Sequence, residues 1–220
     1  MTGRMPSMRK EAANLERVDR KVARKTGHQR DSALMRAVGG IRELADQPPL
    51  IALSAATIAA GILLQKGQVT LTGIRMFASH WLATKAKTFI KHRIDRTRPF
   101  VMLDDGSYHA RKGQSRAPRE NSFPSGHTAG AVAIARAVAR DFPATARIGY
   151  TAAAAAGAVQ LPRGKHYLSD VLVGAAIGLI AEGVISLIIP ARLAKGAEIP
   201  GDPYENRTRV FAVRGRRPNR

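Results

Sequence analysis

Two histidines, a carboxylate and two cations lie in three short stretches of this chain that could together transfer a phosphoryl group. The stretches hold Lys91 and Arg98, then His127, then His166 and Asp170. Each stretch lies where an apolar segment begins or ends, so a helical bundle would bring all three to one pocket. A histidine nucleophile, an acid and cations that hold phosphate oxygens are what transfer through a phosphohistidine requires. This set of residues therefore predicts a phosphate-handling site.

The middle stretch, Pro124-Ser125-Gly126-His127, precedes an Ala- and Val-rich segment. Serine is a favoured helix N-cap, and glycine beside it lets a ligand approach the backbone closely. The N–H groups and the positive end of the helix dipole favour a bound phosphate. His127 would then lie beside that phosphate, where it could protonate a leaving oxygen. The alternative is an ordinary helix start with a packed histidine.

The last stretch places His166 four residues before Asp170, so on a helix the two would share a face. A carboxylate bound to one imidazole nitrogen fixes the tautomer, and the other nitrogen can attack phosphorus. The alternative is a surface or helix-capping pair without a catalytic role.

Four cations, Lys91, Arg93, Arg96 and Arg98, lie within eight residues of one another. Arginine offers a planar fork for phosphate oxygens, and lysine offers a point charge. The alternative is a basic run beside a membrane, and Arg93 and Arg96 are assigned to that run.

Five apolar stretches predict the helices that must position these residues. They span residues 48–64, 69–90, 125–140, 144–161 and 166–189. The first is at the short end of the roughly 17–25 residues that cross a bilayer. The second is amphipathic, and a long loop over 91–123 follows it. Because no strand pattern is visible, we expect an all-α membrane helical bundle of about five apolar helices.

Basic extensions flank the bundle, which we expect to be a membrane-embedded domain over residues 48–190. Residues 1–47 read as a basic and partly helical extension, and residues 191–220 as a basic tail. Apolar residues recur at helical spacing in the N-terminal part, which is typical of a helix lying on lipid headgroups or of a solvated tail with one short packed helix. They are Leu34, Met35, Val38, Ile41 and Leu44. No signal peptide is visible.

The net charge of +20 and the absence of cysteine limit the possible functions. Charge alone would suit a nucleic-acid-binding protein, but aromatic residues make up only 5% of the chain and no groove-reading motif is present. We therefore expect no nucleic-acid partner. Arginine and lysine runs beside apolar helices are more typical of a membrane protein that contacts anionic lipid. A chain without cysteine has no thiolate metal site or cysteine nucleophile.

Taken together, Lys91-x6-Arg98-Pro99, Pro124-Ser125-Gly126-His127 and His166-x3-Asp170 resemble the three-part signature of the type 2 phosphatidic acid phosphatase superfamily. These are membrane lipid phosphate phosphatases, related in their pocket to vanadium haloperoxidases and bacterial acid phosphatases. The resemblance covers roughly residues 45–190. It implies a helical bundle and hydrolysis of phosphomonoesters or diphosphates without a metal or other cofactor.

The resemblance also implies a role for each matching residue. His166 corresponds to the nucleophile, Asp170 to its orienting partner, and His127 to the acid that protonates the leaving group and then activates water. Other positions correspond to the residues that hold phosphate oxygens: Lys91, Arg98, Ser125 and Gly126.

One position departs from the family pattern. The family usually has Ser-Arg seven and six residues before the motif histidine, whereas this chain has Val159 and Gln160. We expect Arg163 to supply the missing phosphate contact from the helix break, and the alternative is a hydrogen bond without charge from Gln160. The departure leaves open a second function, in which a catalytically weakened relative binds anionic lipid or phosphate without turnover.

The expected function is that of an integral membrane phosphatase acting on a lipid phosphate or an isoprenyl diphosphate, since apolar helices around the pocket favour an amphiphilic substrate. The short chain and membrane-like helices argue against a vanadate-dependent peroxidase. The tail over 191–220 carries 8 Lys/Arg against 3 Asp/Glu, which predicts a cytoplasmic C-terminus. Counting three helices back places the active site on the outer face of a bacterial inner (plasma) membrane. Five spans would leave the basic N-terminus outside, so we expect the first or second segment not to cross fully.

Overall fold

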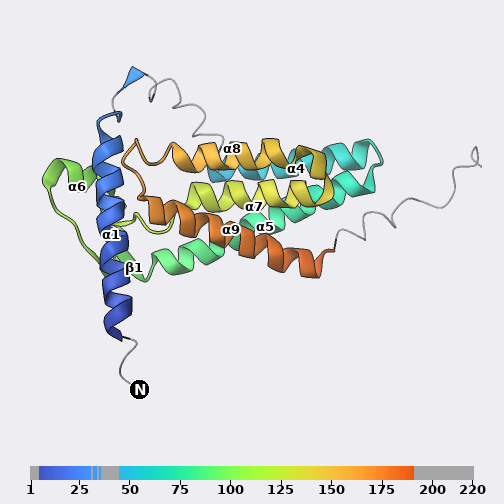
Figure 1. Ribbon diagram of the computed structural model, residues 1–220. Helices are drawn as coiled ribbons and strands as arrows, with labels where there is room; N and C mark the ends of the chain where they lie inside the picture. Colours follow the sequence, from blue (N-terminus) through green and yellow to red (C-terminus); the bar gives the residue numbers. More distant parts are fainter. Residues whose placement is uncertain (1–4, 31, 34, 36–44, 191–220) are drawn as a thin grey trace, which may run out of the picture.

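Five helices run alongside one another in the computed structural model, which describes residues 5–30, 32–33, 35 and 45–190 (Figure 1). They are α4 (Gln47–Leu63), α5 (Gly67–Lys91), α7 (Gly126–Asp141), α8 (Ala146–Ala158) and α9 (Leu168–Ile188). A short 3-10 turn, Pro143–Thr145, connects α7 to α8. The predicted mostly helical fold is confirmed, and the five predicted stretches correspond to these five helices.

Helix α7 lies at the centre of the bundle, where it packs against α5, α8 and α9. Its buried face carries alanines, including Ala129 and Ala133. Glycines of α9 face it: a Cβ on Gly174 would lie 2.5 Å from the carbonyl oxygen of Ser125, and one on Gly178 would lie 2.5 Å from that of Ala129. Small residues on both helices therefore allow the two backbones to approach closely, as in the helix pairs of membrane proteins.

Buried ion pairs hold the helices together at the end of the bundle away from the site motifs. Arg75 of α5 pairs with Asp141 at the end of α7 and also donates to the carbonyl oxygen of Ile189. Glu182 of α9 is fully buried and accepts hydrogen bonds from Arg136 and Arg140 at 2.6–3.0 Å. These contacts neutralise the carboxylate that interrupts the apolar sequence of α9.

The outer surface of the bundle is rich in exposed apolar side chains. Leu63, Ile148 and Leu187 are more than 75% exposed on three different helices. Within the described residues, α9 is the helix that is both long and apolar enough to cross a membrane, while α4 is apolar but has 17 residues. The expected count of about five apolar spans is therefore not confirmed, because α5 carries polar residues along its length and α7 and α8 are short.

The loop over 91–123 contains regular structure, and the expectation of no strand is wrong. Strand β1 (Ile94–Arg96) pairs antiparallel with β2 (Ala110–Lys112), and α6 (Pro99–Asp105) lies between them in sequence. A 3-10 turn, Pro118–Glu120, precedes α7. These elements were not predicted because each has seven residues or fewer, which is too short for a periodic pattern.

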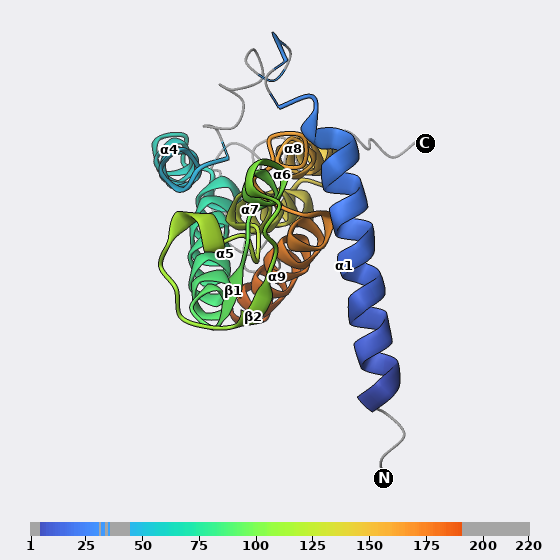
Figure 2. The same cartoon turned by 90° about the vertical axis from the view of Figure 1, so that its left-hand side faces the viewer.

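Helix α1 (Met5–Gly27) crosses the end of the bundle at which β1, α6 and the start of α9 lie (Figures 1 and 2). It contacts α6 and α9, and its N-terminal part extends past the bundle. Helix α1 lies within residues 1–47, the predicted N-terminal extension. The predicted helical spacing from Leu34 to Leu44 and the tail 191–220 lie outside the described residues, apart from Met35.

Candidate active site

The three sequence motifs meet at a cavity of about 600 Å³ at the α1 end of the bundle. The end of α5, the start of α7 and the turn before α9 contribute to its wall, with the residues before α4 at its rim. Its lining includes five of the predicted site residues: Lys91, Arg98, Gly126, His127 and His166. Further lining residues with polar side chains are Asp46, Gln47, Lys87, Gln160 and Lys165.

The two histidines lie next to each other in the lining of this cavity. Their ring centroids are 6.5 Å apart, with the ring planes at 64°. His127 lies in the first turn of α7, and its Nε2 atom is 2.5 Å from a carboxylate oxygen of Asp46. Asp46 is the N-cap residue of α4, so the start of that helix places a carboxylate beside His127.

A backbone carbonyl orients His166. Its Nδ1 atom is 2.6 Å from the carbonyl oxygen of Ser122 and 3.8 Å from a carboxylate oxygen of Asp170. A carbonyl only accepts, so Nδ1 carries the proton and Nε2 is left with its lone pair. The expectation that both residues lie on one helical face is wrong, because Tyr167 is the extended N-cap residue and α9 begins at Leu168. His166 therefore lies just before the helix, on the cavity wall.

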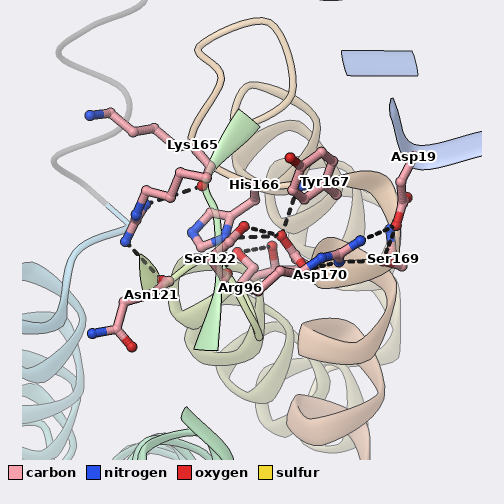
Figure 3. A network of polar contacts seen from close by, with 12 residues as sticks. Asp19, Arg96, Asn121, Ser122, Lys165, His166, Tyr167, Ser169 and Asp170 are labelled. Carbon is pink, nitrogen blue, oxygen red and sulfur yellow. Dashed lines mark hydrogen bonds and ion pairs between the residues drawn. The ribbon is translucent and has the colours of Figure 1, made fainter. Parts of the chain in front are cut away.

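Asp170 is fully buried behind His166, where three donors hold its carboxylate (Figure 3). They are the Ser122 hydroxyl at 2.5 Å, the Tyr167 N–H at 2.7 Å and Nη1 of Arg96 at 2.5 Å. Ser122 thus contacts both members of the predicted pair, one through its hydroxyl and the other through its carbonyl. Asp170 acts on His166 through Ser122 and through its charge.

Burial lowers the pKa of His166 to about 4, because the ring is only 3% exposed. The charge of Asp170 opposes this shift, whereas Arg98 and Lys91 add to it. His166 is therefore neutral at physiological pH. A neutral imidazole with Nδ1 protonated is the form that can act as a nucleophile through Nε2.

Cations surround the rest of the cavity. Lys87 and Lys91 lie one turn apart on α5 and both line it. The guanidinium of Arg98 donates to three backbone carbonyls, those of Pro118, Asn121 and Lys165, at 2.7–3.1 Å. An arginine has five N–H donors, so two more are available to phosphate oxygens. Arg98 therefore fixes the loops around the cavity as well as contributing charge.

Ser125 and Gly126 begin α7 as predicted, but they lie differently with respect to the cavity. Ser125 is fully buried: its N–H donates to the carbonyl oxygen of Asp170 at 3.0 Å, and its hydroxyl lies 3.0 Å from that of Thr128. It joins α7 to α9 and does not line the cavity. Gly126 does line it, and a Cβ there would lie 3.2 Å from Nζ of Lys87.

Arg163 does not line the cavity, contrary to expectation. The turn before α9 is closed by hydrogen bonds from Gly164 to Leu161 and from Lys165 to Gln160. This turn brings Gln160, Lys165 and His166 to the wall instead. Gln160 is 1% exposed, and its amide donates to the carbonyl oxygen of Ala156 at 3.3 Å.

Sequence reasoning missed several residues of this region. Arg96 was assigned to a basic run, yet it is buried and bound to Asp170. Lys87, one helical turn before Lys91, could have been found from that spacing. Asp46 and Lys165 carried no signal, because each lies outside the motifs and reaches the cavity only through the fold.

The model of the PAP2 superfamily matches residues 69–194, more than half of the chain. The lipid A 1-phosphatase of Porphyromonas gingivalis is 35% identical over 83 residues, which is 36% of this chain and 19% of that protein. The matched segment is thus about a fifth of the length of this relative.

Two solved structures are similar in fold. A transmembrane PAP2-type phosphatidylglycerolphosphate phosphatase from Bacillus subtilis has a TM-score of 0.55 and 21% identity, covering 80% of this chain and 86% of its own. Aquifex aeolicus LpxE has a TM-score of 0.53 and 23% identity, covering 75% of this chain and 92% of its own.

Proposed function

The chain belongs to the PAP2 superfamily, and from this membership we propose that it is a membrane phosphatase that hydrolyses a lipid phosphate monoester or an isoprenyl diphosphate. The observation that carries the proposal is the pair formed by His166 and His127, which lie next to each other in a cavity lined by cations. One ring is neutral and buried, and the other lies beside a carboxylate. This asymmetry suits a nucleophile and an acid.

In the first step, Nε2 of His166 attacks phosphorus and the bond from phosphorus to the leaving oxygen breaks. His127 donates its proton to that oxygen, so the alcohol or phosphate leaves in a neutralised form. The new phosphohistidine keeps its proton on Nδ1, where the Ser122 carbonyl accepts it at 2.6 Å. The ring becomes positively charged, and the buried Asp170 carboxylate 3.8 Å away stabilises that charge.

In the second step, His127 is neutral and removes a proton from a water molecule. The resulting hydroxide attacks phosphorus, the P–N bond breaks, and His166 recovers its lone pair on Nε2. Inorganic phosphate is released, and His127 holds the proton for the next cycle. Lys91, Lys87 and Arg98 stabilise the negative charge on the phosphoryl oxygens in both steps. No step requires a metal ion.

An amphiphilic substrate fits the surroundings of the site. The bundle carries exposed apolar side chains on α4, α5, α8 and α9, so its sides suit acyl or prenyl chains. The names of the lipid A and phosphatidylglycerolphosphate phosphatases among its relatives support a lipid substrate. We place the enzyme in the inner (plasma) membrane of a bacterium with its site on the outer face.

The neutral wall residue Gln160 favours a second candidate function, binding of anionic lipid without turnover. Glutamine is uncharged, so it contributes no charge to a bound phosphate, and its side-chain amide donates to the carbonyl oxygen of Ala156. Loss of a charge-assisted contact costs about 1.5–3 kcal/mol. If the contact tightens in the transition state, the rate falls about ten- to a hundred-fold.

Phosphate release from detergent-solubilised protein tests the proposal. Phosphatidic acid and a prenyl diphosphate would be supplied with EDTA present, beside a His166→Ala variant. Turnover that persists with EDTA and is lost in the variant would support the phosphatase. Binding of these lipids without release above the variant would favour the second candidate function.

A further inference from the structure

Asp19, on α1, is buried against the start of α9 although it lies 150 residues away in sequence (Figure 3). The residue is 1% exposed. One carboxylate oxygen accepts the backbone N–H of Ser169 at 3.0 Å, and the other accepts the Ser169 hydroxyl and Nη2 of Arg96, the latter at 2.7 Å. Burial of a carboxylate is costly unless its charge is matched, so this arrangement is built around Arg96.

Arg96 connects Asp19 to Asp170. Its Nη2 binds Asp19, while its Nη1 binds Asp170 at 2.5 Å and the Ser169 hydroxyl at 2.8 Å. The guanidinium also lies over the ring of Tyr167, 4.3 Å from the centroid. Burial alone would lower the pKa of Arg96, but the carboxylates of Asp170 and Asp19 raise it. The guanidinium is thus charged and held on both sides.

The chain of contacts continues to His166. Asp170 accepts the hydroxyl of Ser122, and the carbonyl of Ser122 accepts Nδ1–H of His166. A shift of the Asp170 carboxylate would therefore move the group that orients the nucleophile. Without Asp19, Asp170 would be the one carboxylate bound to Arg96, and the guanidinium would draw it away from Ser122 and Tyr167, which bind its other oxygen.

We propose that Asp19 is a positioning residue, which holds Arg96 so that Asp170 and Ser122 keep Nε2 of His166 aimed at phosphorus. The inference rests on the proposed function for its meaning in catalysis. Helix α1 lies outside residues 69–194, which match the family model. It crosses the end of the bundle and so brings Asp19 to the family motifs from a separate part of the chain. A helix cap without influence on His166 is the competing role.

Vanadate and inorganic phosphate distinguish these two roles. Vanadate becomes five-coordinate by bonding to the attacking nitrogen and so mimics the transition state, whereas phosphate is held in its ground state by the cations. Asp19→Asn keeps an oxygen for the Ser169 N–H but loses the charge that binds Arg96. The matched control is Asp104→Asn, which breaks an exposed ion pair with Arg30 just after α1 and leaves Arg96 untouched.

Binding of both anions to the full chain would be measured by calorimetry, together with kcat, KM and the Tm. In Asp19→Asn we expect vanadate affinity and kcat to fall about tenfold or more, with phosphate affinity and KM changed less than about threefold. Asp104→Asn should leave all four values unchanged.

The outcomes separate the inference from the function on which it rests. Equal vanadate affinity in Asp19→Asn and Asp104→Asn would overturn the positioning role, as would a parallel loss of both anions with a lowered Tm. Wild-type protein that binds vanadate but releases no phosphate from any lipid would overturn the proposed function, while the vanadate comparison still decides the role of Asp19. Wild-type protein that binds neither anion would overturn both.

Discussion

The imidazole rings of His127 and His166 lie edge to face with centroids 6.5 Å apart. Both rings therefore lie close enough together to contact one bound phosphoryl group, and the proposed mechanism gives one the role of nucleophile and the other that of proton donor. The partners of the rings differ in kind: a backbone carbonyl accepts from His166, and the carboxylate of Asp46 lies beside His127. The difference is what the proposed mechanism uses to give two identical side chains separate roles.

The two histidines should respond differently to the leaving group. His166→Ala should abolish phosphate release from every substrate, because no nucleophile remains. His127→Ala should lower kcat/KM by about 10²–10⁴-fold on an alkyl phosphate, the usual contribution of an acid catalyst. An aryl phosphate leaves without protonation, so its loss in kcat/KM, which does not include the later attack of water, should be much smaller. Exposed His28, changed to Ala, is the control, and equal losses on both substrates would contradict the role of His127.

As the pH is lowered, kcat/KM should begin to fall only at an unusually acidic pH. Only neutral His166 can attack, and burial lowers its pKa to about 4. As the pH falls, the neutral fraction therefore persists through the ordinary histidine range near 6.5 and is lost only through about 4. The measurement is kcat/KM against pH. Each value is corrected for the second ionisation of the substrate phosphate, which ³¹P NMR of the substrate measures separately. A corrected acid limb near 6.5 would show that His166 is not the buried nucleophile described above.

The long helices, and the fact that the motifs lie around one cavity, could be predicted from the sequence. The contacts that orient the side chains of the motifs could not. The stretch 125–140 corresponds to α7, Gly126–Asp141, because its apolar run is bounded by a clear start and an Asp-Phe-Pro turn. Lys91, Arg98 and His166 line one cavity as expected. Each of these residues lies next to the end of a predicted helix, and that position was enough to place them together at one end of a bundle.

The contacts of Arg96 and Asp19 could not be predicted in the same way. Arg93 and Arg96 look alike in a basic run, but the Arg93 side chain donates to the carbonyl oxygen of Phe89 and lies over its ring at the nearby end of α5, whereas Arg96 meets α1 and α9. That difference depends on how α1 crosses the end of the bundle. Asp19 likewise reads as one charge in an amphipathic helix until its partner 150 residues away is known.

Close packing of α7 on α9 should make Gly178 intolerant of substitution. A Cβ there would lie 2.5 Å from the carbonyl oxygen of Ala129, so Gly178→Ala should separate the helices and destabilise the protein by about 1–3 kcal/mol. Gly183, five residues later on α9, has open space around it, and Gly183→Ala should be neutral or stabilising by up to about 1 kcal/mol. Thermal unfolding in detergent compares them, and equal Tm values would contradict the close approach.

The buried pair of Arg75 and Asp141 should matter for stability but not for chemistry. Both side chains are at most 1% exposed, at the end of the bundle away from the cavity. Asp141→Ala leaves a buried guanidinium without its carboxylate and should cost about 3–5 kcal/mol. The double variant Arg75→Met with Asp141→Leu removes both charges and should recover much of that loss. The Tm reports stability, and kcat per folded molecule should stay at the wild-type value in both variants.

Restoring a cation at position 160 should strengthen the site. Gln160 lies in the cavity wall at the position where the family usually has arginine, and its side-chain oxygen is buried without a hydrogen-bond partner. Gln160→Arg should add a charge-assisted contact of about 1.5–3 kcal/mol. Phosphate affinity, or kcat/KM if the contact forms mainly in the transition state, should then rise about tenfold or more. Gln160→Met matches the size of glutamine without adding charge, so it should show neither gain. If arginine and methionine gave the same affinity and kcat/KM, position 160 would not face the phosphate, and the missing family cation would not limit this enzyme.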